Sequence, residues 1–307
     1  MFYPQLVAGP IERPQNMLHQ FHTHFKFNWE NMKSGLMLML WGLFKKVVIS
    51  NRLAEMVDYC FDNPSEHPGL TLLVASVFYS FQIYCDFSGY SDIAIGAGRT
   101  MGFTLMKNFD VPYLSKSIGE FWRRWHISLS TWFKDYLYIP LGGSRDGEWK
   151  LYRNLAIVFL VSGLWHGAAW TFIIWGGLHA AFQIMARMRD RYLTFRLPKR
   201  DVLSVVFTFV LVTLAWVFFR AKGLHNAKVI LGKLLTFDFF SGYSMPYSVS
   251  EFMLCWVLIA ALFLKDIFAK EITVKSTPSF FLKFAGLAVL CYFFGVFSGE
   301  QFIYFQF

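Results

Sequence analysis

The sequence predicts an all-α, multi-pass membrane protein, and three observations lead to that fold class. The 307 residues are 55% hydrophobic and only 16% charged, whereas about a quarter of the residues of a soluble domain are charged. Residues 202–219 contain no charged side chain, and residues 154–185 contain only histidines among their titratable groups. Because a helix that crosses the hydrocarbon core needs about 20 mostly apolar residues, runs of this length indicate membrane spans.

Residues 1–50 predict a polar start followed by one interrupted apolar helix. Residues 1–32 are polar, aromatic and rich in His and Gln, which is typical of a loop followed by an interfacial segment. They lack the basic start and apolar core of a cleaved signal peptide, so we expect insertion through the spans themselves. Residues 35–50 are apolar apart from Lys45 and Lys46. They predict either a span whose lysines snorkel or a helix lying in the interface.

The next stretch begins as a span and then acquires carboxylates. Within residues 69–98 the acids are Asp86 and Asp92, six residues apart, so one face of a straight helix would not hold both. They could coordinate a cation, line a cavity or end the helix at an aqueous face. Residues 99–153 are too polar to cross a bilayer freely and too aromatic for an ordinary loop. This part predicts a re-entrant or interfacial element.

The run 154–185 is too long for a single straight span. As one helix it would measure roughly 48 Å, against a hydrocarbon core of about 30 Å. It must therefore tilt, break or turn back, and we place the break at Gly176-Gly177. The basic connector at 186–200 is expected on the cytoplasmic side by the positive-inside tendency.

Three further spans are predicted near 202–219, 252–264 and 280–298, the second of them short and the third interrupted by Lys283. With no internal repeat and no soluble domain boundary, residues 1–307 predict a single membrane-embedded domain of about six or seven spans. The net charge is +9, and the basic residues that produce it lie between the apolar runs. This placement indicates a role in membrane orientation and in contact with anionic lipid rather than binding of nucleic acid.

Several kinds of site find no support in the sequence. The four cysteines form no CxxC pair, so neither a disulfide framework nor a zinc site is indicated. There is no GxSxG elbow, P-loop or HExxH motif. The spacing of His19, His22 and His24 is loosely metal-like, but no Cys or acid accompanies them, so no metal is expected.

His166 is the first candidate for chemistry, because it lies in the uncharged stretch "VSGLWHGAAW". Ionisable residues at membrane depth are costly and usually face a bundle interior or a water-filled cavity. Burial favours the neutral imidazole, the form that a general base requires. Ser162 would share its helical face, whereas His179 would lie on a different face of a straight helix and is not paired with it. The alternative is a core histidine bonded to a backbone carbonyl.

His126 is the second candidate, beside Arg123 and Arg124 in "EFWRRWHISLS". Arginines among aromatic residues suit the phosphates of an acyl carrier or of coenzyme A. The alternative, which the residues alone favour, is an amphipathic interfacial helix whose arginines meet lipid phosphates. Its headgroup-level markers would be Trp122, Trp125 and Trp132.

Five stretches together resemble the membrane-bound O-acyltransferase (MBOAT) family, and most closely its bacterial branch typified by the alginate O-acetylation membrane subunit. They are "PQLVAGPIERP" (4–14), "YCDFSGYSDIAIGAGRTMGF" (84–103), the block 108–145 that contains "FWRRWH", "SGLWHGAAWTFIIWGGLHA" (162–180) and "FIYFQF" (302–307). The resemblance implies a helical bundle around a transmembrane tunnel. Relatives carry further helices before the first stretch, so the resemblance also implies that this chain lacks N-terminal helices of the tunnel wall.

The resemblance implies roles for individual residues. His166 corresponds to the family's catalytic histidine and His126 to a second functional position, both lining the tunnel. The donor would be a thioester, acetyl-CoA, on the cytoplasmic side, and no bound cofactor is expected. An indole N–H from Trp165 or backbone N–H groups near Gly167 could stabilise the oxyanion. The remaining candidates for the tunnel wall or donor site are Arg123, Arg124, Trp165, Ser162, Asp86 and Asp92.

By the same resemblance, acetyl would pass towards an exported or periplasmic acetyltransferase partner that modifies a polysaccharide such as alginate. The protein would reside in the bacterial inner membrane. Two other classes stay open. A transporter or channel would use Asp86, Asp92, His126 and His166 along a substrate path without covalent chemistry. A non-catalytic scaffold would only recruit the exported transferase.

Overall fold

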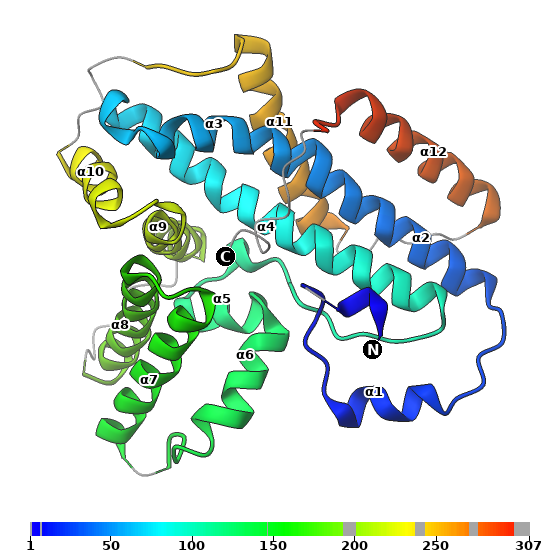
Figure 1. Ribbon diagram of the computed structural model, residues 1–307, viewed down its shortest axis with the longest axis horizontal. Coiled ribbons are helices and arrows are strands. Elements are labelled where there is room, and N and C mark those ends of the chain that lie inside the picture. The colour runs from blue at the N-terminus through cyan, green and yellow to red at the C-terminus, as the bar shows by residue number, and fades with distance from the viewer. Residues whose placement is uncertain are drawn as a thin grey trace. The chain divides into compact units, whose positions relative to one another are not determined.

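The computed structural model describes residues 2–6, 8–145, 147–192, 201–236, 243–269 and 276–297. Within these ranges the chain is helical and contains no strand, which confirms the all-α fold class (Figure 1). The chain divides into two compact units. Of the described residues, unit 1 holds those within 2–56, 80–108 and 245–297, and unit 2 holds those within 57–79 and 109–244. The terminal stretch 302–307 and residues 193–200 of the basic connector lie outside the described residues.

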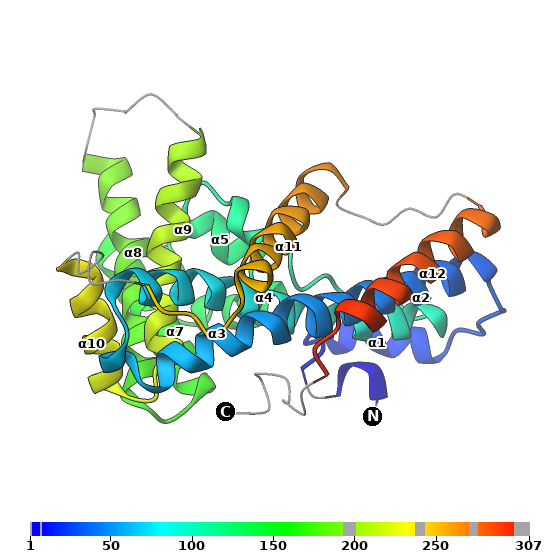
Figure 2. The same cartoon turned by 90° about the horizontal axis from the view of Figure 1, so that it is seen from above.

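Unit 1 contains the helices from both ends of the chain. In order these are the 3₁₀ turn η1 (Tyr3–Gln5), α1 (Pro14–Phe21), α2 (Trp29–Phe44), the π-helical turn η2 (Lys45–Ser50), the start of α3 (Asn51–Asp62), the later part of α4 (Gly69–Thr100), α11 (Val249–Phe268) and α12 (Thr277–Phe294). Helices α2 and α12 pack side by side (Figure 2). The apolar core that they share with η2 and α11 is formed by Leu40, Val47, Val48 and Cys291, with Phe44, Leu258, Phe284, Leu287 and Ala288 packed against it.

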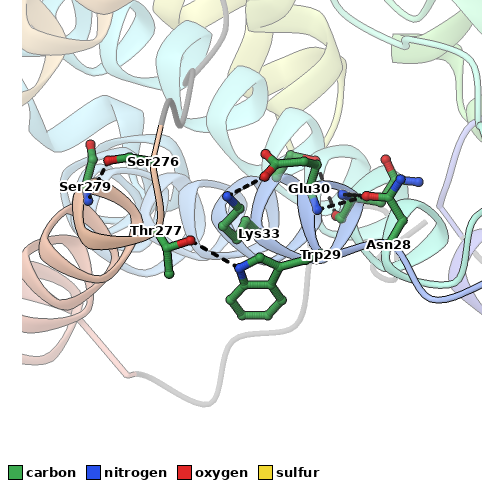
Figure 3. A network of polar contacts seen from close by, with 9 residues as sticks. Asn28, Trp29, Glu30, Lys33, Ser276, Thr277 and Ser279 are labelled. Carbon is green, nitrogen blue, oxygen red and sulfur yellow. Dashed lines mark hydrogen bonds and ion pairs between the residues drawn. The ribbon is translucent and has the colours of Figure 1, made fainter.

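Polar side chains close the end of unit 1 where α2 and α12 begin (Figure 3). Asn28 caps α2 by accepting a hydrogen bond from the backbone N–H of Glu30, and Glu30 pairs with Lys33 at 2.6 Å. The Trp29 indole donates to Thr277 Oγ1 at 3.3 Å. Side-chain caps satisfy N–H groups that the first helical turn leaves unpaired. The same contacts therefore begin α2 and fix it to α12.

Helices α2 and α4 approach closely through glycines. A Cβ added at Gly42 would lie 2.5 Å from the carbonyl oxygen of Gly89, and one added at Gly35 would lie 2.6 Å from that of Gly96. Small residues let helix backbones approach in membrane proteins. This contact leaves no room for side chains between the two helices at these positions.

That approach brings together two ion pairs, one buried and one whose carboxylate is partly exposed. Lys46 Nζ lies 2.5 Å from Asp86 Oδ1, and Lys45 Nζ lies 2.8 Å from Asp92 Oδ2 and donates to Ser88 Oγ at 2.8 Å. The sequence predicted that these lysines either snorkel or lie at a membrane interface, and both predictions were wrong. Lys45 is 4% exposed and Lys46 is 7% exposed, and both side chains point into unit 1. Charges are buried in proteins only when they are paired. The two aspartates neutralise two different lysines, as their six-residue spacing requires, and α4 continues through both.

Unit 2 contains the middle of the chain. Its elements are the end of α3, the 3₁₀ turn η3 (Pro64–Glu66), the start of α4, the 3₁₀ turn η4 (Pro112–Leu114), α5 (Ile118–Arg124), α6 (Ile127–Phe133), the π-helical turn η5 (Lys134–Tyr138), α7 (Glu148–His166), α8 (Trp170–Tyr192), α9 (Asp201–Arg220) and α10 (Leu224–Leu235). The mixed stretch 99–153 thus becomes two short helices joined by turns. Helix α8 packs against both α7 and α9.

The long apolar run breaks between α7 and α8, at residues 167–169, and the predicted break at Gly176-Gly177 was wrong. Gly167 has φ 156°, a backbone conformation that favours glycine. Gly176 lies inside α8, and a Cβ there would be 2.2 Å from the carbonyl oxygen of Phe159 on α7. Gly176 is therefore a packing residue, whereas Gly167 ends the helix.

Among the described residues, α4, α9 and α12 are long and apolar enough to cross a membrane by length and composition. This is fewer than the six or seven spans expected. Helices α9 and α12 fall on the predicted spans near 202–219 and 280–298. The short predicted span at 252–264 is part of the longer helix α11, and α2, α7 and α8 cover the other apolar stretches.

Candidate functional site

His166 lies at the edge of the interior of unit 2. It is the last residue of α7 and is 7% exposed, while its neighbour Trp165 is 61% exposed. Ser162, one turn earlier, is buried on the same helix, as the spacing predicted. The His166 ring meets the rings of Trp175 and Phe219 edge to face, with centroids 5.3 and 5.1 Å apart. The imidazole is therefore fixed by aromatic packing close to an exposed helix end.

The contact between α7 and α8 places Trp175 against His166. A Cβ added at Gly163 would lie 2.4 Å from the carbonyl oxygen of Phe172, so the two helices touch backbone to backbone near the turn. Such close approach depends on glycine. It puts the first turns of α8 beside the last turns of α7.

His126 occupies a strained position at the start of α6. Its backbone is left-handed, with φ 45° and ψ 54°, and the residue is 5% exposed. Its carbonyl oxygen accepts the first hydrogen bond of α6 from Ser130 N–H at 2.9 Å, and just before it Asp110 N–H donates to the carbonyl of Arg124 at 2.9 Å. A residue other than glycine in this conformation costs energy and is retained where surrounding contacts impose it, often at functional sites.

The structure brings His126 and His166 together. Burial lowers the pKa of His126, and the imidazole of His166, distant in the sequence but in the same unit, lowers it further. Protonation of either ring would oppose protonation of the other. These are the two histidines that the sequence analysis singled out, one from the "FWRRWH" block and one from the "LWHG" block.

His179 belongs to the same cluster, although the sequence analysis did not pair it with His166. It has no exposed surface, its Nδ1 accepts a hydrogen bond from Trp122 Nε1 at 3.2 Å, and its ring lies 5.0 Å from that of Trp175. Rings of both His166 and His179 therefore contact Trp175. The straight helix assumed in the sequence analysis is not present, because α7 ends at His166 and α8 begins at Trp170. The spacing of Trp175 and His179, one helical turn apart, was the available signal.

The tryptophans of the "FWRRWH" block pack inside unit 2. Trp125 is buried, stacks on Phe121 at 5.5 Å and lies 5.1 Å from Trp216. Trp122 contacts His179 as described. The interfacial alternative is therefore wrong for these two indoles. Trp132 is half-buried and lies 6.5 Å from the exposed Trp165.

The two arginines of that block differ in their surroundings. Arg124 is half-buried and pairs with Glu120 at 2.6 Å, one turn earlier on α5. Arg123 is exposed. Of the two guanidinium groups, that of Arg123 is the more accessible to a phosphate.

Asp86 and Asp92 are occupied by ion pairs within unit 1. They belong to unit 1, where their carboxylates pair with Lys46 and Lys45. A carboxylate already paired with a buried ammonium group has its charge compensated. The contacts of these two residues thus describe a structural role in holding α2 to α4.

Comparison with known proteins gives a consistent family match. A model of the membrane-bound O-acyltransferase family, MBOAT, matches residues 1–224, which include both histidines. The chain is 44% identical to the peptidoglycan O-acetyltransferase of Helicobacter pylori over 82% of this chain and 48% of that protein. It is 41% identical to the probable alginate O-acetylase AlgI of Pseudomonas putida over 90% of this chain and 58% of that protein.

A more distant match is the teichoic acid D-alanyltransferase of Bacillus subtilis, 26% identical over 74% of this chain and 61% of that protein. The chain spans about half the length of the first two of these relatives.

Proposed function

The chain belongs to the membrane-bound O-acyltransferase family, and from this premise we propose that the protein transfers acetyl from a thioester donor, acetyl-CoA, towards hydroxyl groups of a polysaccharide. The observation that carries the proposal is the buried aromatic cluster of unit 2, in which the rings of Trp175 and Phe219 hold His166, with His126 buried in the same unit. Acetyl-CoA is a substrate in this proposal, and no resident cofactor is invoked.

His166 is the proposed general base. Its ring is held in one orientation by Trp175 and Phe219, at a helix end where the neighbouring Trp165 is exposed. A neutral imidazole there would take the proton of an acceptor hydroxyl as the hydroxyl oxygen attacks the thioester carbonyl. General-base assistance of this kind contributes about 10²–10⁴-fold.

His126 and the arginines have supporting roles in the proposal. Burial lowers the pKa of His126, so its neutral ring would add no positive charge beside His166 when His166 accepts the proton, and it would help to orient the substrate. Arg123, the accessible guanidinium, is the better candidate for the phosphates of the donor, and Arg124 would orient the block through Glu120. Ser162 and Trp165 would line the approach to His166.

The acceptor is proposed from the relatives. Their names pair acetyl with peptidoglycan or alginate, and D-alanyl with teichoic acid. We therefore propose a bacterial inner-membrane location and a polysaccharide acceptor such as alginate. An exported or periplasmic acetyltransferase partner would complete the modification.

The test is the acetyl content of exported polysaccharide in strains that express the full-length protein at matched membrane levels. We expect near-complete loss of acetyl with His166→Ala and with His166→Gln, because both remove the proton acceptor. The matched control is His225→Gln, which changes an exposed histidine of α10 in the same unit and should leave acetylation unchanged.

Two results would contradict the proposal and identify the competing class. Acetylation that persists in both His166 variants would support a scaffold that only recruits the transferase. Substrate flux into proteoliposomes without consumption of acetyl-CoA would support a transporter.

A further inference from the structure

Two N–H groups in the aromatic cluster are buried without a hydrogen-bond partner among the residues that the structure describes. They are Trp175 Nε1, on a residue 1% exposed, and His179 Nε2, on a residue with no exposed surface. Buried polar atoms are paired in the large majority of cases, and each exception calls for an explanation. Because these two atoms belong to residues one helical turn apart, a single explanation should account for both.

The hydrogen bond from Trp122 determines the tautomer of His179. An indole nitrogen can only donate, so His179 Nδ1, which accepts from Trp122 Nε1 at 3.2 Å, carries no proton. A neutral imidazole has one N–H, which must then be on Nε2. The unpartnered atom of His179 is therefore a hydrogen-bond donor, like that of Trp175.

The two donors share one face of a helix beside His166. Trp175 and His179 are four residues apart on α8, so their side chains lie one above the other. Their ring centroids are 5.0 Å apart, and the Trp175 ring lies 5.3 Å from that of His166. Trp175 therefore contacts both the proposed base and the second donor.

We propose that Trp175 Nε1–H and His179 Nε2–H bind the carbonyl oxygen of the acyl thioester and stabilise the oxyanion formed from it. This inference rests on the proposed function and supplies the electrophilic half of the site. It assigns that role to buried donors in place of Trp165, which is mostly exposed. Donors fixed in a site that excludes water need no reorganisation as charge develops, and they are often the largest single contribution to catalysis.

In the proposed transfer His166 acts first as a base and then as an acid. The acceptor hydroxyl gives its proton to His166 while its oxygen forms a bond to the carbonyl carbon, and the π electrons move to the carbonyl oxygen, held by the two N–H groups. When the C=O bond re-forms, the carbon–sulfur bond breaks, and the thiolate takes the proton from His166. Ester and free thiol leave, and the imidazole is neutral again.

The kinetic test uses the full-length protein in nanodiscs with acetyl-CoA. We expect Trp175→Phe and His179→Leu each to lower kcat by about 10²–10³-fold, the usual cost of losing one oxyanion donor, with a much smaller change in KM. His179→Gln keeps an N–H donor at a similar position and should recover part of kcat. The control is Trp216→Phe, a buried neighbour whose indole N–H is already bonded to Tyr113 Oη at 3.2 Å, and kcat should change little.

A spectroscopic test separates this inference from the proposed function. In the His166→Gln background, which prevents turnover, the infrared carbonyl band of bound acetyl-CoA labelled with ¹³C at the carbonyl should lie at lower frequency than in solution. Adding Trp175→Phe or His179→Leu should move the band back towards the solution value.

Variants that keep both kcat and the shifted band would overturn the inference and leave the function standing. A His166→Gln protein that binds no acetyl-CoA, together with wild-type protein that consumes none, would instead overturn the proposed function and this inference with it.

Discussion

At the scale of single residues, His126 shows how the fold uses an unfavourable backbone conformation. Its left-handed φ of 45° places the imidazole at the junction of α5 and α6, buried beside the aromatic cluster. The left-handed region costs roughly 1–2 kcal/mol for residues with a Cβ. A histidine at this position is therefore unfavourable for folding. The proposed function explains its presence, because that function uses the imidazole side chain.

Substitutions can separate the backbone cost from the role of the ring. We expect His126→Gly to melt at a higher temperature than His126→Ala, because glycine adopts this conformation without penalty, and both variants to lose acetyl transfer to a similar extent. Thermal unfolding in detergent and polysaccharide acetylation are the measurements.

The matched control is Ser130, within α6, where the order should reverse and the glycine variant should be less stable than the alanine variant by about 0.5–1 kcal/mol. The same order of stability at both positions would contradict a left-handed His126.

At the scale of elements, the α7–α8 pair positions the site. The turn at Gly167 lets α8 fold back on α7, and Gly163 and Gly176 allow the two helices to touch. The carbonyl of Phe159 occupies the space in which a side chain at Gly176 would lie. Trp175 and His179 flank this contact, so the spacing of the two helices sets where their rings lie relative to His166.

Adjacent glycines on α8 test this arrangement. We expect Gly176→Ala to lower acetyl transfer and thermal stability, because its Cβ would be 2.2 Å from the Phe159 carbonyl oxygen and the helices would have to separate. Gly177→Ala is the control. Its Cβ would meet only ordinary contact, 3.9 Å from Leu160 Cδ2, and the loss of a helical glycine should make it neutral or slightly stabilising. Equal effects of the two substitutions would show that helix spacing does not control the site.

At the scale of the whole molecule, the chain combines apolar helices with charges confined to particular places. In unit 1 the buried lysines are neutralised by aspartates. At the end of α8 the basic residues are exposed. The four free cysteines are all buried, so a cysteine introduced at this end can be labelled selectively to determine on which side of the membrane it lies.

A single introduced thiol should report that orientation. We expect the Arg189→Cys protein to react with a membrane-impermeant maleimide in inverted vesicles and not in spheroplasts, because the positive-inside tendency places this connector in the cytoplasm. The unmodified protein is the control and should stay unlabelled, since Cys60, Cys85, Cys255 and Cys291 are all buried. Labelling in spheroplasts alone would reverse the proposed orientation.

The sequence by itself determined the features that depend on composition and local spacing. Long apolar runs require helices, because backbone polar groups in an apolar environment must pair within the segment, and α4, α9 and α12 follow from that requirement. The spacing of Ser162 and His166 placed both on one helical face, and the two histidine blocks identified the candidate residues before any contact was known.

Only the tertiary structure decided which distant residues meet. Lys45 and Lys46 looked like snorkelling residues until α4 supplied Asp92 and Asp86, and Gly176 looked like a helix break until Phe159 was found against it. His179 entered the cluster because the chain turns back at Gly167. The physical reason is common to all three. Local sequence fixes the face of a helix on which a side chain lies, whereas its partner is set by close packing with a second helix, which no local pattern encodes.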